Sequence, residues 1–470
     1  PPPPEACPGA AVPVDLVAPI EVVGTGTGDS CTGSALRDAV QALNSGSGGS
    51  ITFDCGGEHT ITLTEELFVE SDVIVDGGGE ITLSGGESTR VFSLDHYVNF
   101  TVQNIAIIDA RADEFGAGIY HPWYGALKVI NVHFENNATT AVDADVGGGA
   151  FYAGGCEDVV VSGSTFIANS GSNGGAIDVN GSNMTIVNST FTGNDAFGHG
   201  GSAEQGGLGG AVYIDGMNRE IEVRPFVMCG CTFQDNTATV HGSTVFRHSY
   251  PGGSSTIRNC TFRDNRLEGD GTGTGTLYHG EAPLTLIGST FTGNMTDHHA
   301  GAIFISADDP IAIRNCTFQG NQTPGNGGAL FVGQAHVTIE SCTFADHTAD
   351  YGPAIFCGER CSMTITNSIF AYNAADDSYD GMTCHKTMGG SRNIQWPAER
   401  LSGNPDTPCT EDITFADPLL ETLADNGGPT PTMAIGDGSP ALDSGADCPE
   451  TDQRGEPRSG PCDLGAYEEQ

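Results

Sequence analysis

Two short motifs recur along this chain at a nearly fixed period, and this repetition constrains the fold more than any other feature. The motif Phe-x-x-Asn begins at Phe134, Phe166, Phe191, Phe233, Phe262, Phe291, Phe318 and Phe370. Phe344 belongs to the same series, although His347 takes the place of its Asn. The spacings between successive Phe residues are 32, 25, 42, 29, 29, 27, 26 and 26. A period of this length is typical of a solenoid with one structural unit per repeat.

The second motif, Gly-Gly-Ala, keeps step with the first. Its alanine lies 15 or 16 residues before the next Phe, at Ala150, Ala176, Ala302, Ala329 and Ala354. Runs such as HVTIESCTF between the motifs alternate apolar and polar residues and are rich in β-branched side chains, which indicates short strands. We therefore predict an all-β fold. It is a right-handed, single-stranded parallel β-helix with coils of about 26 residues stacked ~4.8 Å apart.

Each motif position has a predicted role in such a coil. The Phe side chain points inward and stacks on the Phe of the next coil. The Asn follows the end of its strand, where Asn tolerates a left-handed turn, and its amide bonds to the equivalent Asn of neighbouring coils. The Gly-Gly pair marks a tight bend at which a Cβ atom would clash.

The rhythm of the motifs divides the chain into four segments. Residues 1–30 form a Pro-rich leader, residues 31–60 an N-terminal cap, residues 61–375 the β-helix repeats and residues 376–470 an irregular C-terminal region. We expect the leader to be an extended linker or strand, which could add to the strand edge of a neighbouring molecule.

The N-terminal cap contains the one clearly helical pattern in the sequence. Apolar residues in SALRDAVQALN, residues 34–44, recur at helical spacing, and Ser34 is the predicted N-cap. The end of a solenoid exposes strand edges, so a helix at this position would cover the first coil.

The chain has 15 cysteines and no paired zinc-binding motifs, which indicates disulfides formed in an oxidising compartment. Proximity predicts three local pairs, Cys31–Cys55, Cys384–Cys409 and Cys448–Cys462, with Cys357 and Cys361 as further candidates. The odd count leaves at least one cysteine free or paired between molecules.

Four further cysteines stand two residues before a motif Phe and should point inward. They are Cys231, Cys260, Cys316 and Cys342. Adjacent coils would place equivalent Cα atoms within disulfide distance, so we predict axial disulfides Cys231–Cys260 and Cys316–Cys342. The alternative is an internal column of free thiols.

The charge balance excludes several classes of partner. Lys and Arg number 17 against 60 Asp and Glu, which gives a net charge of −43. A phosphate backbone needs a basic face, so nucleic acid is not an expected partner. No apolar run reaches the ~18–20 residues of a membrane span, so we expect membrane attachment only through an anchor outside this sequence. Together with the disulfides, this predicts a secreted, extracellular or cell-surface protein.

Clustered acidic residues are the candidate metal ligands. Asp143 with Asp145, and Asp376 with Asp377 and Asp380, could bind calcium between loops through their carboxylates. The alternative is that these are solvated loop carboxylates without a ligand.

Three parts of the sequence resemble known families. The alternation of Gly-Gly-Ala with Phe-x-x-Asn is similar to the repeats of chlamydial polymorphic outer-membrane proteins. The stretch CTGSALRDAVQALN resembles the CSLREA module, with Cys31, Leu36, Arg37, Ala39 and Asn44 matching. The tail, from DNGGPTPTMAIGDGSPALD to CDLGAYE, resembles the choice-of-anchor Q domain. The resemblance implies a secreted, surface-displayed bacterial β-helix protein of adhesin type, and no catalytic residues come with it.

Two functional hypotheses follow. The first is a non-catalytic protein of adhesion or extracellular structural assembly, whose partner is a cell-surface or glycan ligand or further copies of the same chain in a polymer. It predicts no catalytic or cofactor-binding residue other than the calcium candidates. The alternative is a carbohydrate-active enzyme, a polysaccharide lyase or hydrolase, because the same fold hosts such enzymes.

Overall fold

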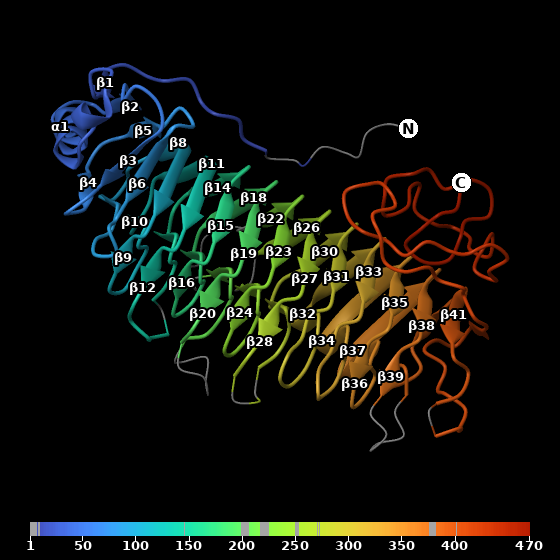
Figure 1. The fold of residues 1–470 in the computed structure, drawn as a ribbon. Helices are drawn as coiled ribbons and strands as arrows, with labels where there is room; N and C mark the ends of the chain where they lie inside the picture. The colour runs from blue at the N-terminus through green and yellow to red at the C-terminus, as the bar shows by residue number, and fades with distance from the viewer. Residues whose placement is uncertain are drawn as a thin grey trace.

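The computed structural model describes the chain except residues 1–6, 8, 9, 145, 199–205, 217–224, 250–252, 270, 272, 376–381 and 401. It confirms the predicted all-β fold, because successive coils stack side by side into one long parallel β-helix (Figure 1). Helix α1 (Gly33–Asn44) closes the N-terminal end, after a short 3-10 turn at Gly28–Ser30. In the described part of the chain, no helix is long and apolar enough to cross a membrane.

Each coil contributes to three columns of strands that pair in parallel with the coils before and after. The first column contains β1 (Ile20–Val23), β2 (Gly49–Phe53), β5 (Val73–Asp76), β8 (Phe100–Ile108), β11 (Ala126–Glu135), β14 (Asp158–Ser162), β18 (Asn183–Val187), β22 (Pro225–Cys229), β26 (Ser254–Arg258), β30 (Leu284–Ile287), β32 (Ile303–Arg314), β34 (Leu330–Glu340), β37 (Ile355–Thr366) and β40 (Gly389–Ser391).

The second column carries the Phe-x-x-Asn motif. It contains β3 (His59–Thr62), β6 (Ile81–Ser84), the later halves of β8 and β11, β15 (Thr165–Ile167), β19 (Thr190–Thr192), β23 (Thr232–Gln234), β27 (Thr261–Arg263), β31 (Thr290–Thr292), β33 (Thr317–Gln319), β35 (Thr343–Ala345), β38 (Ile369–Ala371), β41 (Asn393–Trp396) and β42 (Ile413–Phe415).

The third column follows the Gly-Gly-Ala motif. It contains β4 (Leu67–Val69), β7 (Phe92–Leu94), β10 (Ile119–His121), β13 (Phe151–Gly154), β17 (Ile177–Asn180), β21 (Val212–Asp215), β25 (Val245–His248), β29 (Leu277–Gly280) and the first halves of β32, β34 and β37. Short two-residue strands link the second column to the third: β9 (Arg111–Ala112), β12 (Ala138–Thr139), β16 (Ser170–Gly171), β20 (Asp195–Ala196), β24 (Thr237–Ala238), β28 (Arg266–Leu267), β36 (Thr348–Ala349) and β39 (Ala374–Ala375).

The motif Phe side chains form the axis of the core, as predicted. From Phe134 to Phe370, each ring stacks on the next with centroids 4.3 to 5.3 Å apart. Offset stacking at this separation adds to the free energy gained by burying the rings, so the column stabilises the register between coils.

The motif Asn side chains form a buried amide ladder beside the Phe stack. The Nδ2 of each Asn from Asn137 to Asn294 donates to the Oδ1 of the Asn in the next coil, over 2.8 to 3.0 Å. This confirms the predicted amide ladder. The predicted turn position is wrong, because the left-handed residue is the one before the ladder Asn, for example Asn136, Asp235 and Asp264. The ladder Asn itself points inward.

The glycine pair of the second motif lies where the backbone closely approaches both its own coil and the next one. A Cβ atom on Gly327 would lie 2.4 Å from the Leu330 carbonyl oxygen, and one on Gly328 would lie 2.6 Å from that of Pro353. The predicted steric role of the motif is therefore confirmed.

The N-terminal cap is built around α1. Leu36, Val40 and Leu43 bury the apolar face of the helix against the first coil. The N-cap is Thr32 and not the predicted Ser34, because the Thr32 hydroxyl accepts a hydrogen bond from the Ala35 N–H at 3.2 Å. The N-cap and the start of the helix therefore lie two residues earlier than predicted.

Part of the Pro-rich leader lies against the solenoid of its own chain. Residues 10–19, here called the strap, run along one lateral edge of the first coils (Figure 1). Three strap residues each exchange two hydrogen bonds with one side chain: Ala11 with Ser162, Val14 with Gln103 and Val17 with Ser50. Contacts at every third residue match a polyproline II segment, which has three residues per turn. A disulfide from Cys7 to Cys229 fastens the far end.

The C-terminal region first completes the solenoid with β40, β41 and β42 and then folds back along its side (Figure 1). The Gln453 amide reaches Thr317 and Thr290 over 2.7 and 2.8 Å, and the Tyr372 hydroxyl donates to Asp417 over 2.6 Å. Residues 416–470 thus cover the later coils laterally.

Five disulfides join ten of the cysteines. Besides Cys7–Cys229, which spacing could not suggest, they are Cys31–Cys55, Cys357–Cys361, Cys384–Cys409 and Cys448–Cys462. Cys156, Cys231, Cys260, Cys316 and Cys342 are free and buried.

The predicted axial disulfides are therefore wrong. Adjacent strands in register keep equivalent Cα–Cβ bonds parallel, so the Cβ atoms stay about as far apart as the strands, ~4.8 Å. A disulfide needs a Cβ separation of about 3.5–4.5 Å. Cys231, Cys260, Cys316 and Cys342 instead form the free-thiol alternative, and burial raises the pKa of Cys260 and Cys342 well above the usual value.

Candidate functional site

The predicted calcium ligands form no described cluster. Asp143 is exposed, and its backbone carbonyl accepts a hydrogen bond from Ser172 over 2.7 Å. Asp145, Asp376, Asp377 and Asp380 lie outside the described residues. Among the residues that are described, no group of three or more His, Cys, Asp or Glu side chains could hold a metal ion.

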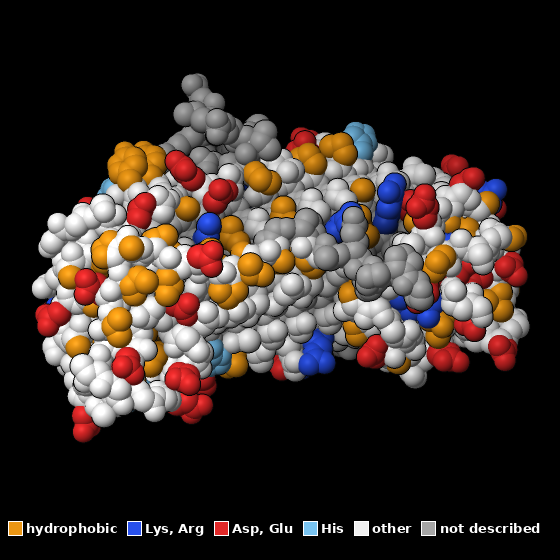
Figure 2. All heavy atoms as spheres, turned by 90° about the horizontal axis from the view of Figure 1, so that it is seen from above, with side chains coloured by type: hydrophobic (Ala, Val, Ile, Leu, Met, Phe, Trp, Pro, Cys, Tyr) orange, Lys and Arg blue, Asp and Glu red, His pale blue; other side chains and the backbone are white. Residues whose placement is uncertain are grey.

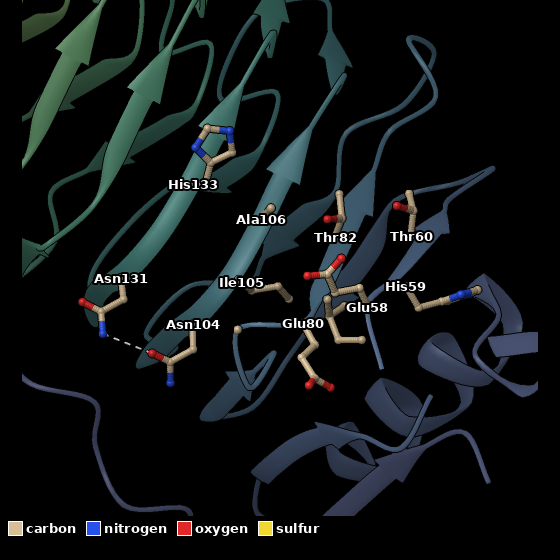
Figure 3. Close-up of a pocket in the computed structure, with 12 residues that line it drawn as sticks. Glu58, His59, Thr60, Glu80, Thr82, Asn104, Ile105, Ala106, Asn131 and His133 are labelled. Carbon is tan, nitrogen blue, oxygen red and sulfur yellow. Dashed lines mark hydrogen bonds between the residues drawn. The ribbon is translucent and has the colours of Figure 1, made fainter. Parts of the chain in front are cut away.

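Among the grooves on the described surface, two larger ones indent the early coils. The first, with a volume of about 670 Å³, crosses β3, β6, β8 and β11 and is called the β3–β11 groove (Figure 3). Glu58 and Glu80 lie at one end, and Asn131 donates to Asn104 over 3.1 Å at the other.

The two histidines of the β3–β11 groove are held by the protein itself. The ring of His133 bonds to Thr165 over 2.7 Å and to Glu135 over 3.0 Å. The Nε2 of His59 bonds to the Cys31 carbonyl over 3.1 Å. The groove therefore offers mainly threonine, amide and carboxylate groups to a ligand.

The second groove, of about 830 Å³, lies beside β7, β9 and β10 and is called the arginine groove. Its lining residues are Glu66, Glu87, Ser88, Thr89, Arg90, Arg111, Ala112, Asp113, Glu114, Phe115, Tyr120 and Thr140. It combines cations, carboxylates, hydroxyls and two aromatic rings in one concavity, so a ligand there could contact polar groups and ring surface together.

Arg90 is fixed from three sides. Its Nη1 lies 2.7 Å from Glu66 Oε2, while Nε and Nη2 donate over 3.0 Å to the carbonyls of Gly116 and Phe115. The guanidinium lies 5.1 Å from the centroid of the Tyr120 ring, a cation–π geometry. Because Arg90 joins two coils, it sets the shape of the groove as well as its charge.

Arg111 holds the opposite wall. Its Nη1 donates to the carbonyls of Ala110 and Asn136 over 2.9 and 2.6 Å. Both arginines thus donate hydrogen bonds to backbone carbonyls, and part of each side chain remains accessible within the groove.

Two residues of an aromatic cluster, Phe115 and Tyr120, line the arginine groove, and the buried Tyr152 packs against both. The ring centroids of Phe115 and Tyr152 are 4.6 Å apart, and Tyr120 lies 5.8 Å from Phe115 and 5.7 Å from Tyr152. Burial raises the pKa of the Tyr120 hydroxyl, against the lowering effect of Arg90. Tyr120 is therefore a neutral hydrogen-bond donor and an apolar surface at neutral pH.

Sequence reasoning missed the arginine groove. Its walls come from Glu66, Arg90, Arg111 and Tyr120, which are 24, 21 and 9 residues apart in the sequence and meet only through the register between coils. The sequence did offer one clue. Lys and Arg are scarce in this chain, so two arginines at similar positions of successive repeats are unusual.

The column arrangement defines the class of protein as a parallel β-helix. The family model for the right-handed β-helix region matches residues 117–309 and 300–394. Because these matches span more than half of the sequence, the chain belongs to that family, in agreement with the handedness predicted from the repeats.

The chain is also similar to individual proteins. A stretch of 200 residues, 42% of this chain, is 30% identical to the metabotropic glutamate receptor-like protein R of Dictyostelium discoideum, of which it spans 11%. The solved structure of a PL6 alginate lyase in complex with a trisaccharide aligns with a TM-score of 0.46 and 14% identity, over 89% of this chain and 91% of that one.

Proposed function

We propose that this protein acts outside the cell as a non-catalytic surface protein that binds polysaccharide chains through its arginine groove, in adhesion or in an extracellular assembly. The observation that carries the proposal is the groove itself. Tyr120 and Phe115 offer apolar ring surface, and Arg111, Glu87 and Asp113 offer charged hydrogen-bonding groups within the same concavity. Sugars present apolar C–H faces and many hydroxyls, so they match this combination.

The charge of the protein narrows the ligand class. The groove has four carboxylates against two arginines, and Asp and Glu outnumber Lys and Arg over the whole chain and on the face seen in Figure 2. Like charges repel, so neutral sugars or amino sugars are favoured over uronic acids.

Calorimetric titration with hexasaccharides of glucose, glucosamine and a uronic acid tests the proposal. We expect binding of at least one of the first two, and at least a tenfold loss of affinity in Tyr120→Ala. Phe68→Ala is the matched control, because Phe68 is an exposed aromatic residue two coils away in the same strand column and lies outside the groove. Unchanged affinity in Tyr120→Ala would refute the assignment of the groove.

A polysaccharide lyase or hydrolase is the second candidate function. Glu66, Glu87, Asp113 and Glu114 line the same groove as two arginines, and carboxylates near a bound sugar are the groups that acid–base catalysis uses. Reducing ends or unsaturated products that accumulate in the titrated mixtures would favour the enzyme over the binding protein.

Secretion and bacterial origin are part of the same proposal. The likeness of residues 31–44 to the CSLREA module and of the tail to the choice-of-anchor Q domain supports them, and the five disulfides fit an extracellular setting. Calcium remains the proposed cofactor, and addition of EDTA should lower the melting temperature if loop carboxylates bind it.

Assembly into a polymer is proposed through the ends of the solenoid. In the described part of the chain, β1 pairs only with β2 and β42 only with β41, so each lacks a second partner strand, although α1 packs against β1. Val22 and Phe415 beside these edges are 56% and 37% exposed. Sedimentation velocity that shows only monomers at high concentration would count against head-to-tail polymers.

A further inference from the structure

Two tyrosines on adjacent coils hold an unusual backbone conformation. Tyr97 and Tyr124 have φ of 69° and 61°, in the left-handed region that bulky residues avoid. Most other non-glycine residues with positive φ in the described chain are Asn or Asp, including Asn104, Asn131 and Asp109. Such strain persists only where the surrounding structure imposes it, and it is found preferentially at functional sites.

A third tyrosine with positive φ, Tyr372, stands at the regular left-handed position before the ladder residue Asn373 and is held by a contact within the chain. Its hydroxyl donates to Asp417 over 2.6 Å, which ties the C-terminal region to the solenoid. Tyr97 and Tyr124 make no comparable hydrogen bond to a described residue and are 68% and 37% exposed. Their strained turns present the rings to solvent instead of to another part of the chain.

The two rings form a flat, double-thickness platform. Their centroids are 4.6 Å apart and their planes differ by 8°. Tyr124 stacks on only one face of Tyr97, and the large exposure of Tyr97 leaves its other face to solvent. An apolar face of this size, ordered and exposed, suits a flat ligand that stacks on it.

The platform lies close to the arginine groove, and the Trp123 ring beside it is 6.4 Å from that of Tyr124. The Tyr152 hydroxyl lies 2.9 Å from the position of a Cβ on Gly154, and Trp123 Cε3 lies 2.7 Å from that of a Cβ on Gly155. Both rings therefore approach the turn at Gly154 and Gly155, and Tyr152 packs 5.7 Å from Tyr120, which lines the groove. Tyr124 follows Tyr120 by four residues, so their Cα atoms are at most about 14 Å apart.

Polar groups flank the platform. Asp72 accepts two hydrogen bonds from Asn99, over 2.8 and 3.0 Å, and Asp95 lies two residues before Tyr97. All three are exposed. A stacking face bordered by carboxylate and amide groups is the arrangement that binds the apolar face of a sugar ring and its equatorial hydroxyls together.

We propose that Tyr97 and Tyr124 form a second sugar-binding subsite, which stacks on a neutral or amino hexose and extends the arginine groove so that one polysaccharide chain occupies both. The inference rests on the proposed function for its class of ligand, and on the platform geometry for its position. It predicts that short sugars use the groove alone and that longer ones gain affinity from the platform.

The test uses the double variant Tyr97→Asn/Tyr124→Asn in the full chain. Asn adopts positive φ readily, so the variant removes the rings and relieves the backbone strain at once. We expect the melting temperature to stay equal or rise, the affinity for the glucosamine or glucose hexasaccharide to fall at least tenfold, and the affinity for the disaccharide to stay unchanged. A purely structural role for the rings would lower the melting temperature and leave both affinities unchanged.

Controls separate this inference from the proposed function. Tyr120→Ala should weaken both disaccharide and hexasaccharide, whereas the platform variant weakens only the longer sugar. Sugar binding that is equal in the wild type and the platform variant would overturn the subsite but leave the groove standing. A wild type that binds none of the sugars would overturn both. A wild-type dimer that the platform variant disperses in sedimentation would show that a second copy occupies the rings, and would overturn the subsite.

Discussion

Replacing His347 by Asn should stabilise this protein, and the gain should grow in mild acid. His347 interrupts the buried amide ladder. Its ring Nδ1 accepts from the Asn321 backbone N–H over 3.1 Å, and its backbone N–H donates to Asn373 Oδ1 over 3.1 Å. The side chain is fully buried, and its Nε2 makes no well-formed hydrogen bond. An Asn would restore the amide bond from Asn321, which is worth about 1 kcal/mol, and remove the unpaired donor.

The pH dependence follows from the same burial. Desolvation lowers the pKa of His347 from 6.5 to about 3 in the folded state. Between these values the unfolded chain binds a proton that the folded chain does not, so the wild type loses about 1.4 kcal/mol of stability per pH unit as pH falls below about 6.5. At pH 5 this loss amounts to about 2 kcal/mol. His347→Asn lacks this loss, so its advantage should grow from about 1 kcal/mol at pH 7.5 to about 3 kcal/mol at pH 5.

Guanidinium unfolding at pH 7.5 and pH 5, with the disulfides intact, measures both values. His336→Asn is the matched control, because His336 is exposed on β34 and should show no such growth. An advantage of His347→Asn that is the same at both pH values, or a variant less stable than the wild type at pH 5, would refute this account of the ladder.

Three further predictions concern the fold. Phe233→Ala should lower the free energy of unfolding in guanidinium by about 3–5 kcal/mol, because it removes one ring from the continuous stack. A decrease below about 1 kcal/mol would contradict that packing. Cys229→Ser should lower the free energy of unfolding by up to about 5 kcal/mol, because the disulfide closes a loop of 222 residues. It should also expose the strap to proteolysis. A strap that stays protected would show that its hydrogen bonds hold it in place without the disulfide. Thiol titration in guanidinium without reductant should count five free cysteines. A count of one would show that both axial disulfides form after all.

The repeat motifs predicted the interior of the solenoid because every coil places the same residue in the same environment. Phe318 and Asn321 are core positions by periodicity alone, and Gly327–Gly328 are fixed by backbone contact. His347 departs from the motif yet occupies the same inward site, so its burial could also be expected from its position.

The outer surface could not be predicted in the same way. Outward residues such as Arg90, Arg111 and Tyr120 follow no repeating sequence pattern. They lie together only because the strands of successive coils pair in register although the coils differ in length. The docking position of the strap could not be predicted either. Polyproline II has no internal hydrogen bonds, and the partners of Ala11 and Val14 lie 151 and 89 residues away. Local sequence determines such a segment's conformation but not its docking position.

Amide hydrogen exchange with and without the tightest-binding neutral or amino hexasaccharide tests most directly whether the arginine groove is the ligand site. The account predicts slower exchange in β9, β10 and the turn through residues 122–125, with no change in β3 and β6. Slower exchange confined to β3, β6 and the later half of β11 would instead assign the ligand to the β3–β11 groove and would contradict the account.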